Sequence, residues 1–192
     1  VLSNNLSAGL FGAMVETART YGGGAVAVED TVTGTLTRKR LLISARVLGR
    51  RFAAITEPGE AVGVLLPNAN GAVVTFFGLQ SGGRIAAMLN YTSGPANIAS
   101  AVRTAKIRTI VSSRAFIEKA ELGDLVTAID GTGAKILWLE EVRETISTQE
   151  KLEAALLWSR PLHPVKPEDA AVILFTSGSE GTPKGVVLSH CN

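Results

Sequence analysis

The sequence contains little cysteine, little charge and few aromatic side chains. Its 192 residues include one cysteine, Cys191, which excludes a disulfide framework and a cysteine-rich metal cluster and suits a reducing, cytoplasmic compartment. Charged residues make up 19% of the chain, against about 25% in typical soluble domains. The formal net charge of +2 is too small to indicate a nucleic-acid partner.

No segment is typical of a membrane span or of a secretion signal. Residues 61–83 carry no charge, but Pro67 and Asn68 divide them into two shorter buried elements. The first five residues lack a basic region followed by an apolar core, so no signal peptide is expected. The chain also begins without Met, which suggests that it was cut from a longer protein.

What the sequence does contain indicates one large buried core. Hydrophobic residues account for 46% of the chain, and glycine occurs 20 times. A chain low in charge and rich in Ala, Val and Gly is typical of buried parallel strands joined by tight turns. We therefore expect one domain, or one part of a larger domain.

Hydrophobic periodicity predicts alternating helices and strands. Helices are expected at Ser7–Thr20, Lys39–Ile55, Ala69–Gln80, Pro95–Thr104, near Ala115–Ile129 and near Thr148–Trp158. Strands are expected at Ala25–Val28, Thr33–Thr37, Val62–Leu66, Ile85–Leu89, Thr109–Val111, Lys135–Leu139, Ala170–Phe175 and Val186–Leu188. This alternation predicts an α/β fold with a doubly wound, mostly parallel sheet flanked by helices.

The helix expected at Lys39–Ile55 is basic. Lys39, Arg46 and Arg50 share one face at helical spacing. Such a face can bind anionic lipid or an acidic partner, but it lacks large flanking aromatic residues. We therefore interpret it as the solvated outer face of a packed helix.

A polar segment separates the last two apolar strands. It holds three glycines, four hydroxyl side chains and one lysine: Gly178, Gly181 and Gly185; Thr176, Ser177, Ser179 and Thr182; and Lys184. Glycines with positive φ let several backbone N–H groups converge on an anion, while hydroxyls and the ammonium add donors. Pro183 precedes the lysine and a strand follows it, so the segment is not a Walker A loop. On composition alone, a plain Gly/Ser hairpin loop remains the alternative.

The segment Thr176–Gly185 resembles the phosphate loop of the adenylate-forming (AMP-binding) superfamily. Residues Gly59–Asn68 and Gly82–Asn90 resemble an early strand with its Pro-Asn turn and the following helix end and strand. The resemblance implies that residues 1–192 are a partial N-terminal AMP-binding domain, truncated just after the phosphate loop. It implies that the phosphates of ATP contact Thr176, Ser177, Gly178, Ser179, Glu180, Gly181, Thr182 and Lys184.

A narrower resemblance is also visible. Glu180 stands where the superfamily usually has Thr, and with Asn68–Phe77 and Ser113–Gly123 it resembles the synthetase half of bacterial bifunctional acyl-[acyl-carrier-protein] synthetase/2-acylglycerophosphoethanolamine acyltransferases. Members activate a fatty acid with ATP and Mg²⁺ and pass the acyl group, through carrier protein, to a lysophospholipid. That implies a parent enzyme at the cytoplasmic side of the bacterial inner membrane. Glu180 either contacts Mg²⁺ or points to a basic partner outside the loop.

Two alternatives remain. The first is a long-chain fatty acyl-CoA ligase without an acyltransferase half, and the second is a non-catalytic subdomain whose apolar faces form an interface. We assign no catalytic residue within these 192 residues, because the superfamily's later motifs would lie downstream. His190, in a Ser-His ending typical of the motif, is expected to be structural. The isolated chain is expected to fold, to be inactive and to self-associate through the strand at Val186–Leu188.

Overall fold

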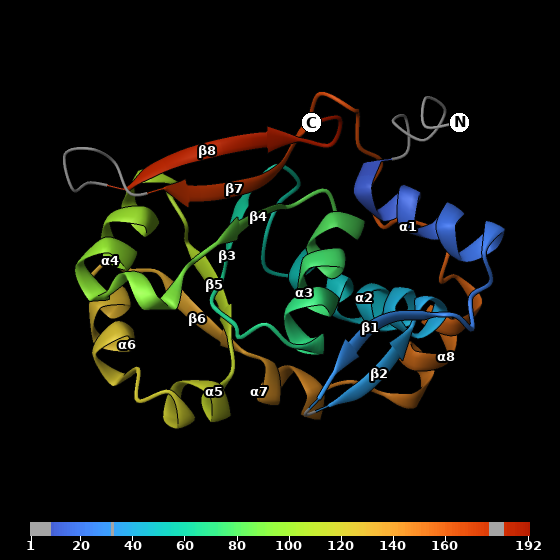
Figure 1. Ribbon diagram of the computed structural model, residues 1–192, viewed down its shortest axis with the longest axis horizontal. Helices are drawn as coiled ribbons and strands as arrows, with labels where there is room; N and C mark the ends of the chain where they lie inside the picture. The colour runs from blue at the N-terminus through green and yellow to red at the C-terminus, as the bar shows by residue number, and fades with distance from the viewer. Residues whose placement is uncertain (1–8, 32, 177–182) are drawn as a thin grey trace.

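A six-stranded sheet with helices on both faces forms the body of the molecule (Figure 1). The computed structural model describes residues 9–31, 33–176 and 183–192. The helices are α1 (Gly9–Thr20), α2 (Arg38–Ala53), α3 (Asn70–Ser81), the 3₁₀ turn η2 (Tyr91–Ser93), α4 (Pro95–Thr104), α5 (Arg114–Lys119), α6 (Gly123–Asp130), α7 (Leu139–Glu144) and α8 (Thr148–Leu156). The strands are β1 (Val26–Asp30), β2 (Gly34–Thr37), β3 (Ala61–Val64), β4 (Ile85–Met88), β5 (Thr109–Ser112), β6 (Lys135–Trp138), β7 (Ala170–Thr176) and β8 (Lys184–Ser189).

The main sheet has the strand order β6-β5-β3-β4-β7-β8. Its first five strands pair in parallel, and β8 runs antiparallel to β7 at the edge. Strands β1 and β2 form a separate antiparallel hairpin. The predicted α/β fold with a mostly parallel, doubly wound sheet is therefore confirmed.

Each face of the sheet carries its own apolar core. Val62, Val64 and Ala86 pack with residues of α2, α3 and α7 on one face. Leu65 and Ala87 belong to the core on the other face, which α4 and α6 cover. Successive side chains of a strand point to opposite faces, so strands covered on both sides are apolar at nearly every position. That is why these strands lack polar alternation.

For residues 61–83, the sequence predicts two buried elements and no membrane span. The uncharged stretch divides into β3 and α3, as its Pro-Asn punctuation indicates. Within the described part of the chain, no helix is long and apolar enough to cross a membrane.

Helices α2 and α3 approach each other closely at glycine. A Cβ on Gly49 would lie 2.4 Å from Ser81 Oγ and 2.7 Å from the carbonyl oxygen of Gly78. One to two turns before Gly49, on the same face, α2 packs Leu42 and Ala45 against α1. Helix α2 thus joins α1 to the layer that covers the sheet.

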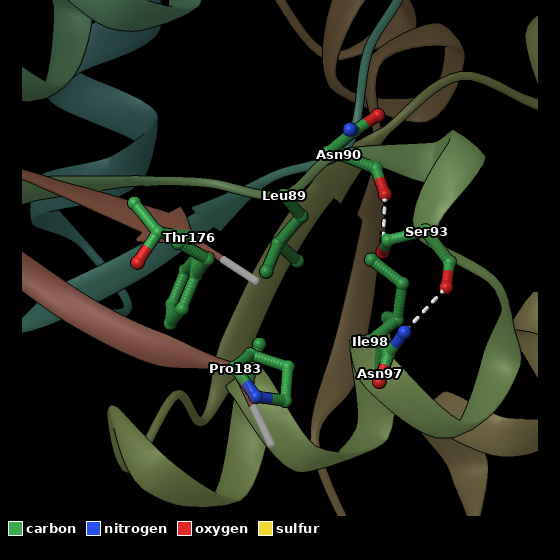
Figure 2. A pocket seen from close by; sticks show the side chains of 9 residues that line it. Leu89, Asn90, Ser93, Asn97, Ile98, Thr176 and Pro183 are labelled. Carbon is green, nitrogen blue, oxygen red and sulfur yellow. Dashed lines mark hydrogen bonds between the residues drawn. The ribbon is translucent and has the colours of Figure 1, made fainter. Parts of the chain in front are cut away.

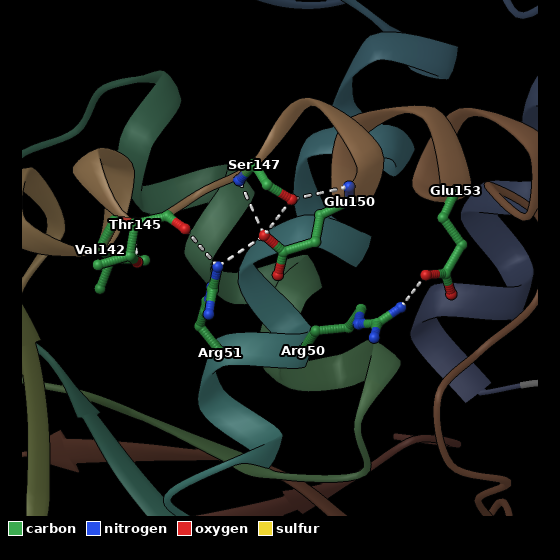
Figure 3. Close-up of polar contacts among 7 residues, drawn as sticks. All are labelled: Arg50, Arg51, Val142, Thr145, Ser147, Glu150 and Glu153. Carbon is green, nitrogen blue, oxygen red and sulfur yellow. Dashed lines mark hydrogen bonds and ion pairs between the residues drawn. The ribbon is translucent and has the colours of Figure 1, made fainter.

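The prediction of a solvated basic face on α2 is wrong at Arg46, whose side chain is only 7% exposed. Its guanidinium donates a hydrogen bond to the carbonyl of Arg160 in the linker that follows α8. Arg50 forms an ion pair with Glu153 of α8 (Figure 3). The cause is long-range: α8 and the linker, more than ninety residues away in sequence, pack across this face of α2.

The single helix predicted near Ala115–Ile129 is two helices, α5 and α6. Glu121 between them has φ of +53°, and the Leu122 N–H donates to the Ile117 carbonyl, which ends α5 as a C-terminal cap does. The strand predicted at Lys135–Leu139 ends one residue earlier, because Leu139 begins the unpredicted helix α7.

Candidate functional site

The candidate site lies at the carboxyl ends of the parallel strands. The chain leaves β3 into α3 on one face of the sheet and leaves β4 into α4 on the other. A crevice opens where neighbouring strands send their connections to opposite faces, and ligands of doubly wound folds bind there. The carboxyl end of β7 lies beside that of β4, since the two strands pair in parallel.

Strands β7 and β8 bring the ends of the predicted phosphate loop together. Thr176 and Lys184 are register partners in the antiparallel pair. Directly opposed residues of such a pair hold their side chains on the same face, with Cβ atoms about 5 Å apart. The hydroxyl of Thr176 and the ammonium of Lys184 therefore start from one face of the hairpin, at the base of the loop.

Six of the eight predicted phosphate contacts lie outside the described residues: Ser177, Gly178, Ser179, Glu180, Gly181 and Thr182. Their role stays a prediction, as does the Mg²⁺ role of Glu180. Gly185 is described and differs from expectation, because it lies in β8, paired with Phe175, and is absent from the residues with positive φ. A Cβ there would lie 3.4 Å from Cγ2 of Ile173, an ordinary packing distance, so packing does not require glycine at this position.

Lys184 is exposed at this edge, and no described carboxylate forms an ion pair with it. Thr176 is exposed as well. An exposed ammonium that starts from the same face as a hydroxyl is a donor set that suits an anion. Over residues 9–31, 33–176 and 183–192, no group of three or more His, Cys, Asp or Glu side chains could hold a metal ion.

A pocket of about 430 Å³ adjoins Thr176 and Pro183 on the side of α4 (Figure 2). Its apolar side chains come from the end of β4, from α4 and from β7: Leu89, Ile98, Ala101 and Phe175. Its polar side chains come from η2 and the start of α4: Asn90, Ser93 and Asn97. The described lining of the pocket is thus uncharged and about half apolar, and it includes Thr176 and Pro183, the described residues on either side of residues 177–182 of the predicted phosphate loop.

Hydrogen bonds fix the polar wall of this pocket. Asn90 Oδ1 accepts from the N–H of Thr92 at 3.1 Å, and Ser93 Oγ donates to the carbonyl of Asn90 at 2.7 Å. Asn97 Nδ2 donates to the carbonyl of Ser93 at 2.8 Å (Figure 2). Sequence reasoning missed these three pocket residues. A local signal for this turn was present. Asn90 can accept a hydrogen bond from the backbone two residues later, and Gly94-Pro95 is typical of a helix start.

His190 lies away from the loop, just past the far end of β8. Its Nδ1 accepts a hydrogen bond from the N–H of Leu10 at 3.3 Å, in the first turn of α1. The imidazole is buried, and burial lowers its pKa, partly opposed by the carboxylate of Asp169. His190 thus satisfies one of the N–H groups that the start of a helix leaves free.

Comparison with known proteins identifies the family of the chain. Residues 14–192 match the AMP-binding enzyme family. The chain belongs to that family. The phosphate-binding role of its strand–loop–strand end stays a prediction.

Two curated relatives are similar over most of this AMP-binding chain. The 4-coumarate–CoA ligase of Pinus taeda is 29% identical over 156 residues, which cover 78% of this chain and 27% of the relative. The medium/long-chain-fatty-acid–CoA ligase FadD6 of Mycobacterium tuberculosis is 27% identical over 158 residues, covering 76% and 24%. The chain thus spans about a quarter of the length of each of these two relatives.

A solved structure shows the same fold. The anthranilate CoA ligase AuaEII, in complex with anthranoyl-AMP, superposes with a TM-score of 0.73 at 19% identity, over 97% of this chain and 34% of that one. At that identity the likeness shows the fold of the AMP-binding chain and leaves its substrate open.

Proposed function

We propose that this chain supplies the phosphate-binding wall of an ATP-dependent ligase that activates a carboxylic acid as its acyl-adenylate. The observation that carries the proposal is the pairing of Thr176 with Lys184 at the carboxyl edge of the sheet, beside a 430 Å³ pocket. Membership of the AMP-binding enzyme family supports it.

The described residues fit a polyphosphate by their chemistry. Lys184 offers an ammonium that no described carboxylate neutralises, and Thr176 offers a hydroxyl donor on the same face. Bound ATP supplies the α-phosphorus that a carboxylate attacks, with pyrophosphate as leaving group. Lys184 then offsets negative charge on the departing phosphates, and the hairpin holds them in place. Among the described residues no group of three or more His, Cys, Asp or Glu side chains could hold a metal ion, and no step is assigned to Mg²⁺.

For the substrate we propose a fatty acid, and for the acceptor the thiol of acyl-carrier protein or of CoA. The similarity to a medium/long-chain-fatty-acid–CoA ligase supports the acid and CoA. The carrier-protein acceptor, transfer to a lysophospholipid and a place at the cytoplasmic side of the inner membrane rest on the narrower resemblance around Glu180. The 192-residue chain alone is expected to show no turnover, because it supplies one wall of the site.

The proposal can be tested with the Lys184→Ala variant of the intact ligase that contains this chain. Losing one charge-assisted contact to phosphate costs about 1.5–3 kcal/mol, so pyrophosphate release with ATP and a fatty acid should slow roughly tenfold or more. Lys166→Ala, at an exposed lysine of the linker, is the matched control and should leave the rate unchanged. An unaltered rate in Lys184→Ala would rule out the assignment. Comparing CoA with acyl-carrier protein as acceptor then separates the two ligase types.

A second candidate, a non-catalytic interface, has one observation in its favour. Leu174 and Val186 are exposed register partners on β7 and β8, and Val187 is exposed too. This candidate predicts that Lys184→Ala leaves every activity of the intact protein unaltered.

A further inference from the structure

A second pocket, of about 480 Å³, shares no lining residue with the one beside Thr176. It lies among the β1–β2 hairpin, α2, α3 and the segment that runs from α7 into α8. Its volume is within the range of about 300–1,000 Å³ that is usual for small-molecule sites. Seven apolar side chains line it: Leu36, Ile43, Val47, Leu48, Val74, Leu139 and Ile146.

The two charged residues that line this second pocket are both basic. Arg143 of α7 and Lys151 of α8 line it, and none of its lining residues is Asp or Glu. Both cations are exposed, and neither forms an ion pair with any residue that the structure describes. An apolar pocket with two free cations is complementary to an anion that carries an apolar body.

Asn70 holds the wall of the pocket that faces the β1–β2 hairpin. Its amide Nδ2 donates at 2.8 Å to Thr33 Oγ1 and at 2.8 Å to the carbonyl of Gly34, and its backbone N–H donates to the carboxylate of Asp30. These bonds tie the hairpin to the start of α3.

The two cations are attached to a fixed segment. Arg51 of α2 donates to the carbonyl of Thr145 at 2.7 Å and to the Glu150 carboxylate at 2.7 Å (Figure 3). Ser147 and Glu150 form a capping box at the start of α8. These contacts hold the turn between α7 and α8 in place, so less ordering is needed when a ligand binds.

We propose that this pocket binds a small amphipathic monocarboxylate with an unbranched apolar body. The carboxylate pairs with Arg143 and Lys151, and the body packs against the seven apolar side chains. The site is independent of the proposed ligase function, because it shares no residue with the phosphate-loop region.

Calorimetric titration of the 192-residue chain tests this site with two eight-carbon probes, octanoate and octylammonium. We expect saturable binding of octanoate and none of octylammonium. Lys151→Gln removes one exposed cation and should weaken binding about two- to fivefold. Lys119→Gln, an equal change of charge on α5, should leave the affinity unchanged.

Gly71→Leu is designed to fill the pocket without disturbing the fold. Gly71 lies in α3, and a Cβ there meets only Leu139 Cδ1, at 3.8 Å, so a side chain can enter the cavity. This variant should retain its circular dichroism spectrum and lose carboxylate binding. Wild-type affinity in folded Gly71→Leu, or equal binding of octylammonium, would overturn the site. If Gly71→Leu failed to fold, the site would instead be overturned by Lys151→Gln and Lys119→Gln weakening carboxylate binding equally.

Discussion

His190 has a structural role, although a histidine that follows a predicted phosphate loop could also be catalytic. Its Nδ1 accepts from the N–H of Leu10, which requires an unprotonated nitrogen. Burial lowers the pKa of His190, with Asp169 opposing part of the shift. The last residues of the described chain thus hold the first turn of α1 through one titratable bond.

This bond makes stability depend on pH. The folded-state pKa of His190 lies below the unfolded value of about 6.5, so its stabilising contribution is fully present above that pH and is lost as the pH falls toward the folded-state pKa. Urea unfolding at about pH 7.5 and about pH 5.5 should therefore show a larger loss of unfolding free energy in the wild type than in His190→Gln. Glutamine can accept the same bond without titrating.

His163→Gln is the matched control for this measurement. It removes a histidine of the linker and should retain the wild-type loss of stability between the two pH values. Equal losses in the wild type and in His190→Gln would show that the bond to Leu10 does not control the pH dependence.

At the scale of elements, the contact between α2 and α3 depends on glycine. Gly49→Ala would place a Cβ 2.4 Å from Ser81 Oγ and 2.7 Å from a backbone oxygen that cannot rotate away. Overpacking of this kind costs about 1–3 kcal/mol. Chemical unfolding of Gly49→Ala should show a loss of that size in the free energy of unfolding.

Gly123→Ala in α6 is the matched control. A Cβ there meets nothing within 4 Å, so this change should be neutral or slightly stabilising. A Gly49→Ala variant as stable as Gly123→Ala would show that the helices move apart freely.

The parallel strands and most helices could be predicted because their signals are local. Strands covered on both faces are apolar throughout, and glycine or proline ends many elements. The break at Glu121 could not be predicted, since a glutamate rarely adopts positive φ. The burial of Arg46 escaped prediction for another reason: the elements that cover it follow more than ninety residues later.

In the candidate site, too, the contiguous segment could be predicted from the sequence, and the pocket formed by distant residues could not. Composition indicates the strand–loop–strand segment, because glycine, hydroxyls and lysine are contiguous there. The pocket beside it joins the end of β4 to the end of β7, residues that are more than eighty positions apart. Only the order of strands in the sheet brings Asn90 next to Thr176, and local sequence does not encode that order.

At the scale of the whole molecule, β8 gives the sheet an exposed edge. Leu174, Val186 and Val187 are 42%, 43% and 57% exposed, and β8 has no neighbour on its outer side among the described strands. Unpaired backbone groups next to exposed apolar side chains favour pairing with another chain. The predicted self-association of the 192-residue chain therefore has a defined surface.

Sedimentation velocity over a concentration series tests this surface. The weight-average sedimentation coefficient of the wild type should rise with concentration, and Val186→Lys should suppress the rise, because a charge on an edge strand opposes pairing. Leu156→Lys is the matched control: Leu156 is 82% exposed on α8, so it gains the same charge away from the edge. If Leu156→Lys dissociated the chain as well as Val186→Lys did, α8 would be a contact surface too. A wild type that stays monomeric at every concentration would show that the edge, although apolar and unpaired, is too short to hold two copies together.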